Sequence, residues 1–406
     1  MRIFTAVRHS INPGYFYGGL WSSNFYPALQ KLGYEIVESQ VDLLPSSRFM
    51  QIPGNFTTQE KEVRSQITQK ILDEVRQAHQ QKPIDLFLSY FYNSHFDPAG
   101  FEQIHQLGIP TINFYCNSIY QFELVSQIAA KVNFSWHTEK NARESYLEVG
   151  ANPVWVQMGA DPGVYHPVAG VNSQTKACFV GQRYADRDRL LAKLITNKIP
   201  VDVYGSGWNG SIPSANSSSQ FPKQSTTVYL GRQLQQPGSI RSYTQAAWSF
   251  VKNEGVIAGL KRTIRQLNYR HQSRQLDSIL ATAACGFADS LSETFAKYAV
   301  ILNFSNVLAD GRPGSKLIPH VRLRDFEAPM CRTCYLTGYT DEITEFYELG
   351  KEIDTYSFPE ELVDKTKFYL DYPTEAEKLR EAGHQRALLD HTWKRRFEQL
   401  FSKINF

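Results

Sequence analysis

Short, mainly apolar runs alternate along the chain with longer segments whose apolar residues recur every three or four positions. The run 84–90 is of the first kind and predicts a buried strand. Segment 58–81 is of the second kind, because Val63, Ile67 and Ile71 fall on one face of a helix. Strands separated by helices of roughly 10–20 residues predict βαβ units, and hence parallel sheets covered by helices on both faces.

The alternation fills the first 168 residues, so we predict an N-terminal α/β domain over 1–168. Its expected strands are 1–8, 34–39, 84–90, 111–115, 131–136 and 153–158. Its expected helices are 22–33, 58–81, 98–107 and 139–148. A stretch rich in proline, glycine and polar residues begins at Asp161, and we place a linker at 169–175.

The pattern restarts at residue 176 and predicts a second α/β domain over 176–390. Its expected strands are 176–181, 200–204, 299–304 and 334–337. Its expected helices are 186–197, 321–329, 343–348, 359–369 and 373–387. A last helix at 393–404 has Thr392 as its N-cap and belongs to a separate C-terminal segment, 391–406.

The stretch 209–285 is an insertion that the α/β pattern does not need. Its first part, 210–227, is low-complexity loop, and its second part is helical and basic. Nine Lys and Arg residues between 223 and 274 face only Glu254, a local charge of +8. Apolar residues recur there at helical spacing: Val256, Ile257, Leu260, Ile264 and Leu267. This stripe either packs on the protein's own core or, with Lys261, Arg262 and Arg265 beside it, lies on an anionic membrane surface.

Composition narrows the functional class. The 406 residues carry a formal net charge of +3, which is too small to indicate nucleic-acid binding. The five cysteines are few and odd in number, which is typical of a reducing compartment rather than a disulfide framework. The apolar runs are far shorter than the ~20 residues that span a bilayer, and the N-terminus reads as a strand. We therefore expect a cytoplasmic protein, at most peripheral to the membrane.

Three short motifs suggest chemistry that their surroundings do not favour. Residues 205–210 match G-x-G-x-x-G, but a loop follows where a dinucleotide site needs a helix, so these glycines favour a turn or a close backbone approach. Asp186 and Asp188 resemble a metal-binding pair, but they open a helix among arginines, which favours capping and ion pairs. Cys331 and Cys334 form a lone C-x-x-C without the further ligands that zinc needs. We expect no metal and no cofactor.

An anion site is the best candidate in the second domain. Gly181 and Arg183 lie between a predicted strand and a predicted helix, where backbone N–H groups and a bidentate guanidinium can hold phosphate. The loop 310–316 adds Arg312, Ser315 and Lys316, although its glycines lack P-loop spacing. A plain turn and a surface loop are the alternatives.

Segment 320–329 concentrates Arg322, Arg324 and Glu327 at a helix start. A carboxylate in this place can accept two hydroxyl groups of a ribose or sugar; alternatively it pairs with one of the two arginines. In the first domain, His9 and Asp97 follow predicted strands, at the edge where parallel sheets bind ligands.

Several of these segments resemble the CgeB-like (spore-maturation-type) glycosyltransferases, which are GT-B enzymes of the glycosyl-transferase group 1 type. The resemblance covers most of the chain outside 209–285. The segments that carry it are GIPTINFYCNS, VQMGADPGVYHP, FVGQRYADRDRLLAKL, YAVILNFSN and HVRLRDFEAPMCRTCYL.

The resemblance implies two Rossmann-like domains with parallel sheets facing across a cleft, the donor bound by the second and the acceptor by the first, and a last helix that packs back on the first domain. Glu327 matches the second acid of the family's E-x7-E pattern and is expected on the ribose, whereas Pro319 stands in place of the first acid. Arg332 stands where a glycine is common.

We therefore predict a metal-independent glycosyltransferase that moves a sugar from a nucleotide-diphospho-sugar to a glycan, lipid-linked or small-molecule acceptor. The predicted catalytic residues are His9 and Asp97, and the predicted acceptor side is Gly18 and Gly19. The predicted donor-binding residues are Gly181, Arg183, Tyr204, Gly205, Ser315, Lys316, Arg322, Arg324 and Glu327. A non-catalytic nucleotide-sugar or glycan-binding protein on the same fold is the alternative; weak contact with anionic membranes is expected through 241–274.

Overall fold

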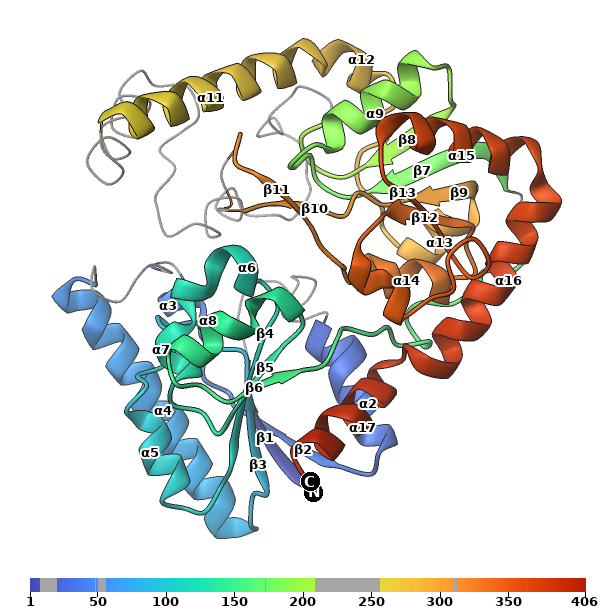
Figure 1. Cartoon of the computed structure of the whole chain (residues 1–406). Helices are drawn as coiled ribbons and strands as arrows, with labels where there is room; N and C mark the ends of the chain where they lie inside the picture. The colour runs from blue at the N-terminus through green and yellow to red at the C-terminus, as the bar shows by residue number, and fades with distance from the viewer. Residues whose placement is uncertain are drawn as a thin grey trace. The chain divides into compact units, whose positions relative to one another are not determined.

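The chain forms two units, each built on a parallel β-sheet (Figure 1). The computed structural model describes residues 1–7, 20–47, 49, 56–171, 173–208, 256–309, 311 and 313–406. Unit 1 contains the described residues of Met1–Asp161 together with Trp393–Phe406, and unit 2 contains the described residues between Pro162 and Thr392. The division therefore falls after Asp161, ahead of the linker placed at 169–175.

Unit 1 has a six-stranded sheet in the order β2-β1-β3-β4-β5-β6, with all neighbours parallel. Its strands are β1 (Arg2–Ala6), β2 (Glu35–Glu38), β3 (Leu86–Ser89), β4 (Thr111–Tyr115), β5 (Phe134–His137) and β6 (Pro153–Trp155). Each expected strand of this domain is present, and β6 ends three residues before the predicted end at residue 158. The strands β3 and β4 are buried throughout, as their apolar runs require.

The helices of unit 1 connect successive strands. They are η1 (Trp21–Phe25, a π-helix), α2 (Tyr26–Lys31), α3 (Leu44–Ser47), α4 (Thr58–Gln81), α5 (Gly100–His105), α6 (Ser118–Gln121), η3 (Phe122–Leu124), α7 (Ser126–Ala129), η4 (Lys140–Ala142) and α8 (Arg143–Glu148). Helix α4 has the predicted bounds, because Thr57 and Glu60 form a capping box that fixes its first residue.

The C-terminal helix α17 (Trp393–Lys403) completes unit 1. The ring of Trp393 lies 4.3 Å from that of Phe25, and the ring of Phe397 lies 5.6 Å from that of Trp136. Arg396 donates from Nε to the carbonyl oxygen of Met158 at 2.7 Å. The end of the chain thus packs into an aromatic core whose other residues come from the first 161 positions.

Unit 2 has a five-stranded sheet in the order β13-β12-β9-β7-β8, again with all neighbours parallel. Its strands are β7 (Gln174–Val180), β8 (Val201–Tyr204), β9 (Tyr298–Leu302), β12 (Tyr335–Gly338) and β13 (Asp354–Tyr356). The chain leaves β7 to form β8 on one side and returns to form β9 on the other. This reversal is a topological switch point, and ligands of such sheets bind outside the strand ends there.

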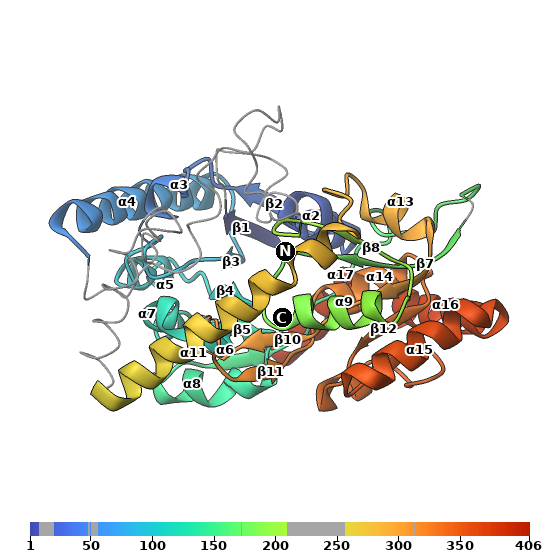
Figure 2. The ribbon, with the colours of Figure 1, turned by 90° about the horizontal axis from the view of Figure 1, so that it is seen from above.

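The helices of unit 2 are α9 (Arg187–Thr196), α11 (Val256–Gln275), α12 (Asp277–Ala281), α13 (Leu291–Ala296), α14 (Arg324–Met330), the 3₁₀-helix η6 (Asp341–Glu345), α15 (Pro359–Asp371) and α16 (Pro373–Asp390). Helices α15 and α16 lie side by side (Figure 1 and Figure 2). The helix predicted at 343–348 is wrong in type and position, because Thr340 caps the earlier turn η6.

A two-stranded antiparallel hairpin, β10 (Asn306–Leu308) and β11 (Leu317–Pro319), follows β9. The loop predicted at 310–316 lies between these strands, and its residues Asp310 and Arg312 are outside the described part of the chain. The hairpin itself was not predicted, because strands of three residues carry no readable periodicity.

Candidate functional site

The carboxyl ends of β7 and β9 form the edge of unit 2 where the topology predicts a ligand. Residues 181–186 follow β7 and lead into α9, and residues 303–305 follow β9. The start of α14 and the hairpin β10–β11 supply further residues near this edge, as the contacts below show.

Two predicted site glycines hold the loops of this edge together. Gly205 has φ +126°, and a Cβ atom there would lie 2.3 Å from the carbonyl oxygen of Gly181. Trp208 donates from Nε1 to the same oxygen at 2.7 Å. The N–H of Gly181 binds the carbonyl of Tyr204, and the N–H of Gly205 binds the carbonyl of Gly286. The amides of both glycines are therefore engaged within the protein. Close backbone approach explains Gly205, whereas a Cβ at Gly181 would lie 2.7 Å from the Phe179 ring.

Arg183 also has protein partners. Its Nη1 donates to Asp277 Oδ1 at 2.6 Å, and its Nη2 lies 3.4 Å from Asp188 Oδ2. The Nη2 atom further donates to Ser273 Oγ at 2.9 Å. These contacts tie the loop after β7 to α11 and α12, so the structure gives Arg183 a bracing position rather than an open one.

Arg187, which the sequence reasoning did not single out, lies beneath the same loop. It is 7% exposed, and its Nη1 donates to the carbonyl of Gln182 at 2.9 Å. A Cβ at Gly181 would lie 3.2 Å from that Nη1, so the absence of a side chain leaves room for the guanidinium. Burial, together with the positive charge of Arg322, lowers the pKa of Arg187 to about 9.

Arg322 and Arg324 reach this edge from the start of α14. The Nη2 of Arg322 lies 3.4 Å from the carbonyl oxygen of Asn306, and the side-chain amide of Asn306 donates to Asp186 Oδ2 at 2.7 Å. Arg324 donates from Nη1 to Glu327 Oε2 at 2.5 Å. Glu327 is buried and pairs with Arg324, which is the alternative to a ribose contact that the sequence analysis left open. Its role toward a ribose stays a prediction.

A buried carboxylate fixes the beginning of α14. Asp325 accepts hydrogen bonds from the backbone N–H of Arg322 at 2.6 Å, from Tyr335 Oη at 2.8 Å and from Thr337 Oγ1 at 2.9 Å. Burial raises the pKa of Asp325 despite these donors. The helix therefore begins at Arg324 rather than at the predicted residue 321, and the two arginines on either side of Leu323 are held in place.

Three arginines at this edge have buried Nε atoms without a hydrogen-bond partner within the described part of the chain: Arg187, Arg322 and Arg324. The Nε atoms of Arg64 and Arg183 share this property, but the Nη atoms of Arg183 are held by Asp277 and Ser273. Among the first three, the charges are close enough that those of Arg322 and Arg324 both lower the pKa of Arg187. Because buried polar groups are nearly always paired in folded proteins, this cluster is suited to a bound anion. We call Arg187, Arg322 and Arg324 the arginine cluster.

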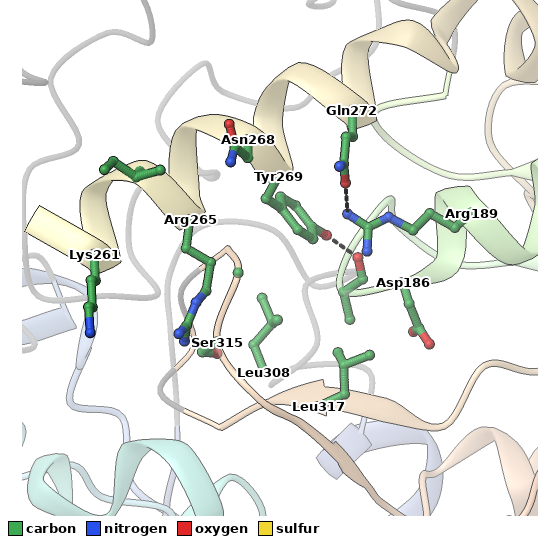
Figure 3. Close-up of a pocket in the computed structure, with 13 residues that line it drawn as sticks. Asp186, Arg189, Lys261, Arg265, Asn268, Tyr269, Gln272, Leu308, Ser315 and Leu317 are labelled. Atoms are coloured by element: carbon green, nitrogen blue, oxygen red, sulfur yellow. Dashed lines mark hydrogen bonds between the residues drawn. The ribbon is translucent and has the colours of Figure 1, made fainter. Parts of the chain in front are cut away.

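A cavity of about 530 Å³ lies beside Asp186 (Figure 3). Helix α11 supplies one wall with Lys261, Arg265 and Tyr269, and the hairpin supplies the other with Leu308 and Leu317. The predicted residue Ser315 also lines it, and its buried Oγ has no partner among the described residues. The cavity is therefore cationic on the helix side and apolar on the hairpin side.

Two predicted donor residues lie differently. The hydroxyl of Tyr204 lies 2.8 Å from that of Tyr298, the first residue of β9, and so reaches toward the amino end of the sheet. Lys316 is exposed on the hairpin loop. The structure thus brings Ser315, Arg322, Arg324 and Glu327 to this edge, and adds Arg187 to them.

The candidates of unit 1 are only partly described. His9, Gly18 and Gly19 lie outside the described residues. Asp97 follows β3; its Oδ1 accepts from the N–H of Ala99 at 3.1 Å, and its Oδ2 lies 3.4 Å from Arg64 Nη2. These contacts place Asp97 in the turn before α5, and its catalytic role stays a prediction.

The sequence reasoning passed over two titratable groups at the end of β5. His137 is fully buried, and burial lowers its pKa to about 4. Glu139 is buried as well and accepts from the N–H of Ile119 at 3.0 Å. Their position directly after a predicted strand was the available signal.

The metal and thiol motifs have ordinary surroundings. Asp188 accepts from Ser273 Oγ at 2.6 Å, and no cluster of three or more His, Cys, Asp or Glu suited to a metal occurs among the described residues. Burial raises the pKa of both Cys331 and Cys334 to about 12, which makes these thiols unreactive. In the described part of the chain, no helix combines the length and the apolar character needed to cross a bilayer.

Comparisons with solved structures give the fold. A sucrose-phosphate synthase from Thermosynechococcus elongatus is similar over 100% of this chain and 99% of its own, with 11% identity and a TM-score of 0.54. A glycosyltransferase from Rickettsia africae ESF-5 is similar over 100% of this chain and 98% of its own, with 10% identity and a TM-score of 0.56. HepE from Anabaena, solved in complex with UDP and glucose, is similar over 100% of this chain and 99% of its own, with 10% identity and a TM-score of 0.52.

A comparison with curated protein sequences gives no significant match. The likeness to the solved structures confirms the predicted fold class: the chain has the GT-B fold, with two Rossmann-like domains. Residues 283–402, which include β9 and α14, match the model of the family described as glycosyl transferase-like.

Proposed function

We propose that the chain is a glycosyltransferase that takes its sugar from a nucleotide-diphospho-sugar bound at the carboxyl edge of the unit 2 sheet. The observation that carries this proposal is the arginine cluster, whose three buried Nε–H groups have no partner in the described part of the chain. A diphosphate supplies the acceptor oxygens and the negative charge that these groups lack.

The reaction class follows from the same charges. Transfer of the sugar leaves negative charge on the diphosphate, and fixed cations in a dry site stabilise that charge as it develops. Three guanidinium groups can supply the positive charge that a divalent ion supplies in other enzymes. Metal independence is therefore part of the proposal.

Glu327 is proposed to hold the donor's ribose. Its Oε2 is engaged by Arg324, and burial together with the negative charge of Glu327 raises the pKa of Tyr165 well above the usual range. The two carboxylate oxygens of Glu327 can accept hydrogen bonds from two ribose hydroxyls.

The structural neighbours support the nucleotide class. HepE has been solved in complex with UDP-glucose as well as with UDP. We propose a uridine nucleotide on that basis. The acceptor, a glycan, lipid-linked or small molecule, is proposed to enter from unit 1, where His9, Gly18, Gly19 and Asp97 were predicted.

Two finer expectations remain proposals. One is that the protein is of the CgeB-like type, which rests on the sequence segments quoted above. The other is a cytoplasmic location, which rests on the free cysteines.

The proposal is tested by calorimetric titration with UDP and with UDP-sugars in excess chelator. We expect binding by the wild type, and Arg322→Gln to weaken UDP at least tenfold, because one charge-assisted hydrogen bond is worth about 1.5–3 kcal/mol. Arg143→Gln, at an exposed position of α8, is the matched control and should leave UDP binding unchanged. Binding that requires Mn²⁺ would refute metal independence, and failure to bind any nucleotide would refute the donor site.

The alternative is a binding protein without turnover, and Pro319 at the end of β11, in place of the first family acid, is the observation that favours it. Release of UDP from UDP-sugars in the presence of candidate acceptors separates the two. Glu327→Gln should lower donor affinity about tenfold in a variant that still folds. Unchanged affinity would show that Glu327 serves only to hold Arg324.

A further inference from the structure

Helix α11 is attached to unit 2 through polar side chains. Gln272 Oε1 accepts from Arg189 Nη2 at 2.9 Å, and Ser273 Oγ donates to Asp188 Oδ2 at 2.6 Å. The hydroxyl of Tyr269 donates to the carbonyl of Ala185, and its ring lies 4.9 Å from the Arg189 guanidinium (Figure 3). The side of α11 that faces the sheet edge is therefore its polar side.

Two residues of the apolar stripe of α11, Leu260 and Leu267, lie on the opposite side, and the third, Ile264, lies between them and the cavity that it lines. Leu260, Ile264 and Leu267 are 57%, 50% and 49% exposed. Tyr269 follows Leu260 by nine residues, which is about 2.5 turns of an α-helix, so the two side chains leave the helix in opposite directions. For these three residues, the alternative in which the stripe packs on the protein's own core is wrong. An amphipathic helix normally faces its domain with the apolar side, and Leu260 and Leu267 of α11 depart from this arrangement.

The charge of α11 is of one sign. Its sequence holds five Lys and Arg residues and no Asp or Glu. Lys261 and Arg274 are exposed; at about 100° per residue they lie on either side of the stripe that begins at Leu260, with Lys261 at the border that also lines the cavity. The exposed part of the helix thus combines a row of aliphatic side chains with one cation on each border.

We propose that α11 docks the protein on an anionic membrane surface, with Leu260, Ile264 and Leu267 among the lipid chains at the interface and the flanking cations on the headgroups. This combination of one aliphatic row and cationic borders is the pattern of helices that lie in the membrane interface. Charge complementarity favours anionic lipid, because the Lys and Arg residues of α11 attract acidic headgroups and the helix has no Asp or Glu to repel them. The inference does not depend on the donor site.

Co-sedimentation of the full chain with vesicles tests this docking. We expect binding to vesicles of phosphatidylcholine with 30% phosphatidylglycerol in low salt, little binding to pure phosphatidylcholine, and loss of binding in 0.5 M NaCl, where charge attraction is screened. The double reversal Lys261→Glu with Arg274→Glu should lower the partition coefficient more than tenfold, since each cation near the surface contributes roughly fivefold.

Matched variants separate α11 from the protein as a whole. Lys70→Glu with Lys367→Glu makes the same change in net charge at exposed positions of α4 and α15 and should leave vesicle binding within twofold. Replacing Leu260, Ile264 and Leu267 by serine should lower binding at least tenfold, whereas serine at the exposed Leu388 and Leu389 of α16 should not. Circular dichroism confirms that each variant is folded.

Three outcomes overturn the proposal. One is that the wild type ignores anionic vesicles even in low salt. Another is that both charge reversals weaken binding equally, which would show a general effect of net charge. The third is that light scattering shows a dimer which the serine variant of α11 disperses, because the stripe would then be covered by a second copy of the chain.

Discussion

Replacement of Arg187 by methionine should stabilise the free protein and weaken its binding of UDP, a combination that a purely structural residue does not produce. Methionine keeps most of the volume under Gly181 and removes the charge. Lowering the pKa of Arg187 from the ordinary value of a guanidinium to about 9 corresponds to about 5 kcal/mol for keeping this side chain charged in its buried position.

Part of that energy is offset by contacts that methionine loses. The hydrogen bond to the carbonyl of Gln182 is worth about 1 kcal/mol, and the guanidinium lies 5.4 Å from the Phe179 ring and 5.8 Å from the Tyr184 ring. A buried cation–π contact can reach about 2 kcal/mol, but both of these lie near the ~6 Å limit of the interaction, so we assign about 0.5–1 kcal/mol to each. We therefore expect the free energy of unfolding to rise by about 2 kcal/mol, within the ~1–4 kcal/mol found when buried charges are replaced by apolar groups.

UDP affinity should change in the opposite direction. Loss of one charge-assisted hydrogen bond, worth about 1.5–3 kcal/mol, lowers affinity about 10- to 150-fold. Urea unfolding without ligand gives the first quantity and calorimetric titration with UDP gives the second. A variant that is less stable than the wild type and binds UDP equally well would refute the reasoning.

Arg183→Met is the matched control in the same loop. Arg183 pairs with Asp188, which is buried, and with Asp277. Its removal leaves a buried carboxylate without its cation, so stability should fall by about 3–5 kcal/mol. UDP affinity of the folded fraction should change less than threefold, because Arg183 is directed at α11 and α12. The two arginines, four positions apart, are thus expected to respond with opposite signs of stability change.

Three further predictions concern the scaffold. Burial lowers the pKa of His137 to about 4, so the folded protein keeps this imidazole neutral while the unfolded chain takes up a proton as the pH falls through about 6.5. The free energy of unfolding, measured with urea, should therefore be about 2 kcal/mol lower at pH 5 than above pH 7. His137→Gln should remove this pH-dependent loss. Gly383→Ala should lower the melting temperature, although alanine favours helices, because the new Cβ would lie 2.2 Å from the carbonyl oxygen of Glu352 and overpacking costs about 1–3 kcal/mol. In native protein one thiol of five, the exposed Cys285, should react with a disulfide reagent, more slowly than a free thiol because burial of its sulfur raises its pKa; reaction of Cys331 or Cys334 at the same rate would contradict the burial of the C-x-x-C pair.

The sheets were predictable because their strands are short apolar runs between amphipathic helices. The helix at 58–81 could be placed to the residue, since its capping residues are local in sequence. The hairpin β10–β11 could not, because its three-residue strands depend on pairing across the eight residues that separate Leu308 from Leu317.

The candidate site was predictable as a region and less so as a set of side chains. Arg322, Arg324 and Glu327 were found because a helix start with both charges is visible in sequence. Arg183 and Arg187 stand in the run 183–189, RYADRDR, and nothing local in the sequence shows which of them makes structural contacts with α11 and α12. The contacts are made by Arg183, whose Nη atoms donate to Ser273 and Asp277, about 90 positions away, whereas Arg187 is buried beneath the loop.

Backbone conformation explains why glycine is favoured at the position that Arg332 occupies in this chain. Arg332 has φ +57°, a left-handed conformation that favours glycine, which the resemblance places at this position. Its guanidinium pairs with Glu377 and Glu381 of α16, and these contacts offset part of the strain. The sequence shows the substitution, but only the structure shows that the side chain has partners.

Helix α11 shows a property that hydrophobic periodicity alone cannot predict, namely the direction in which an apolar face points. The spacing of Leu260, Ile264 and Leu267 fixes that they share a face, but it does not fix where that face points. The direction is set by Tyr269, Gln272 and Ser273, which bind residues of α9 or the loop before it, some 85 positions earlier in the chain. Leaving a large aliphatic side chain half exposed forgoes about 1 kcal/mol of burial. Three such side chains in one row, on a helix whose polar side is anchored by hydrogen bonds, therefore leave about 3 kcal/mol that burial in an external apolar phase would supply.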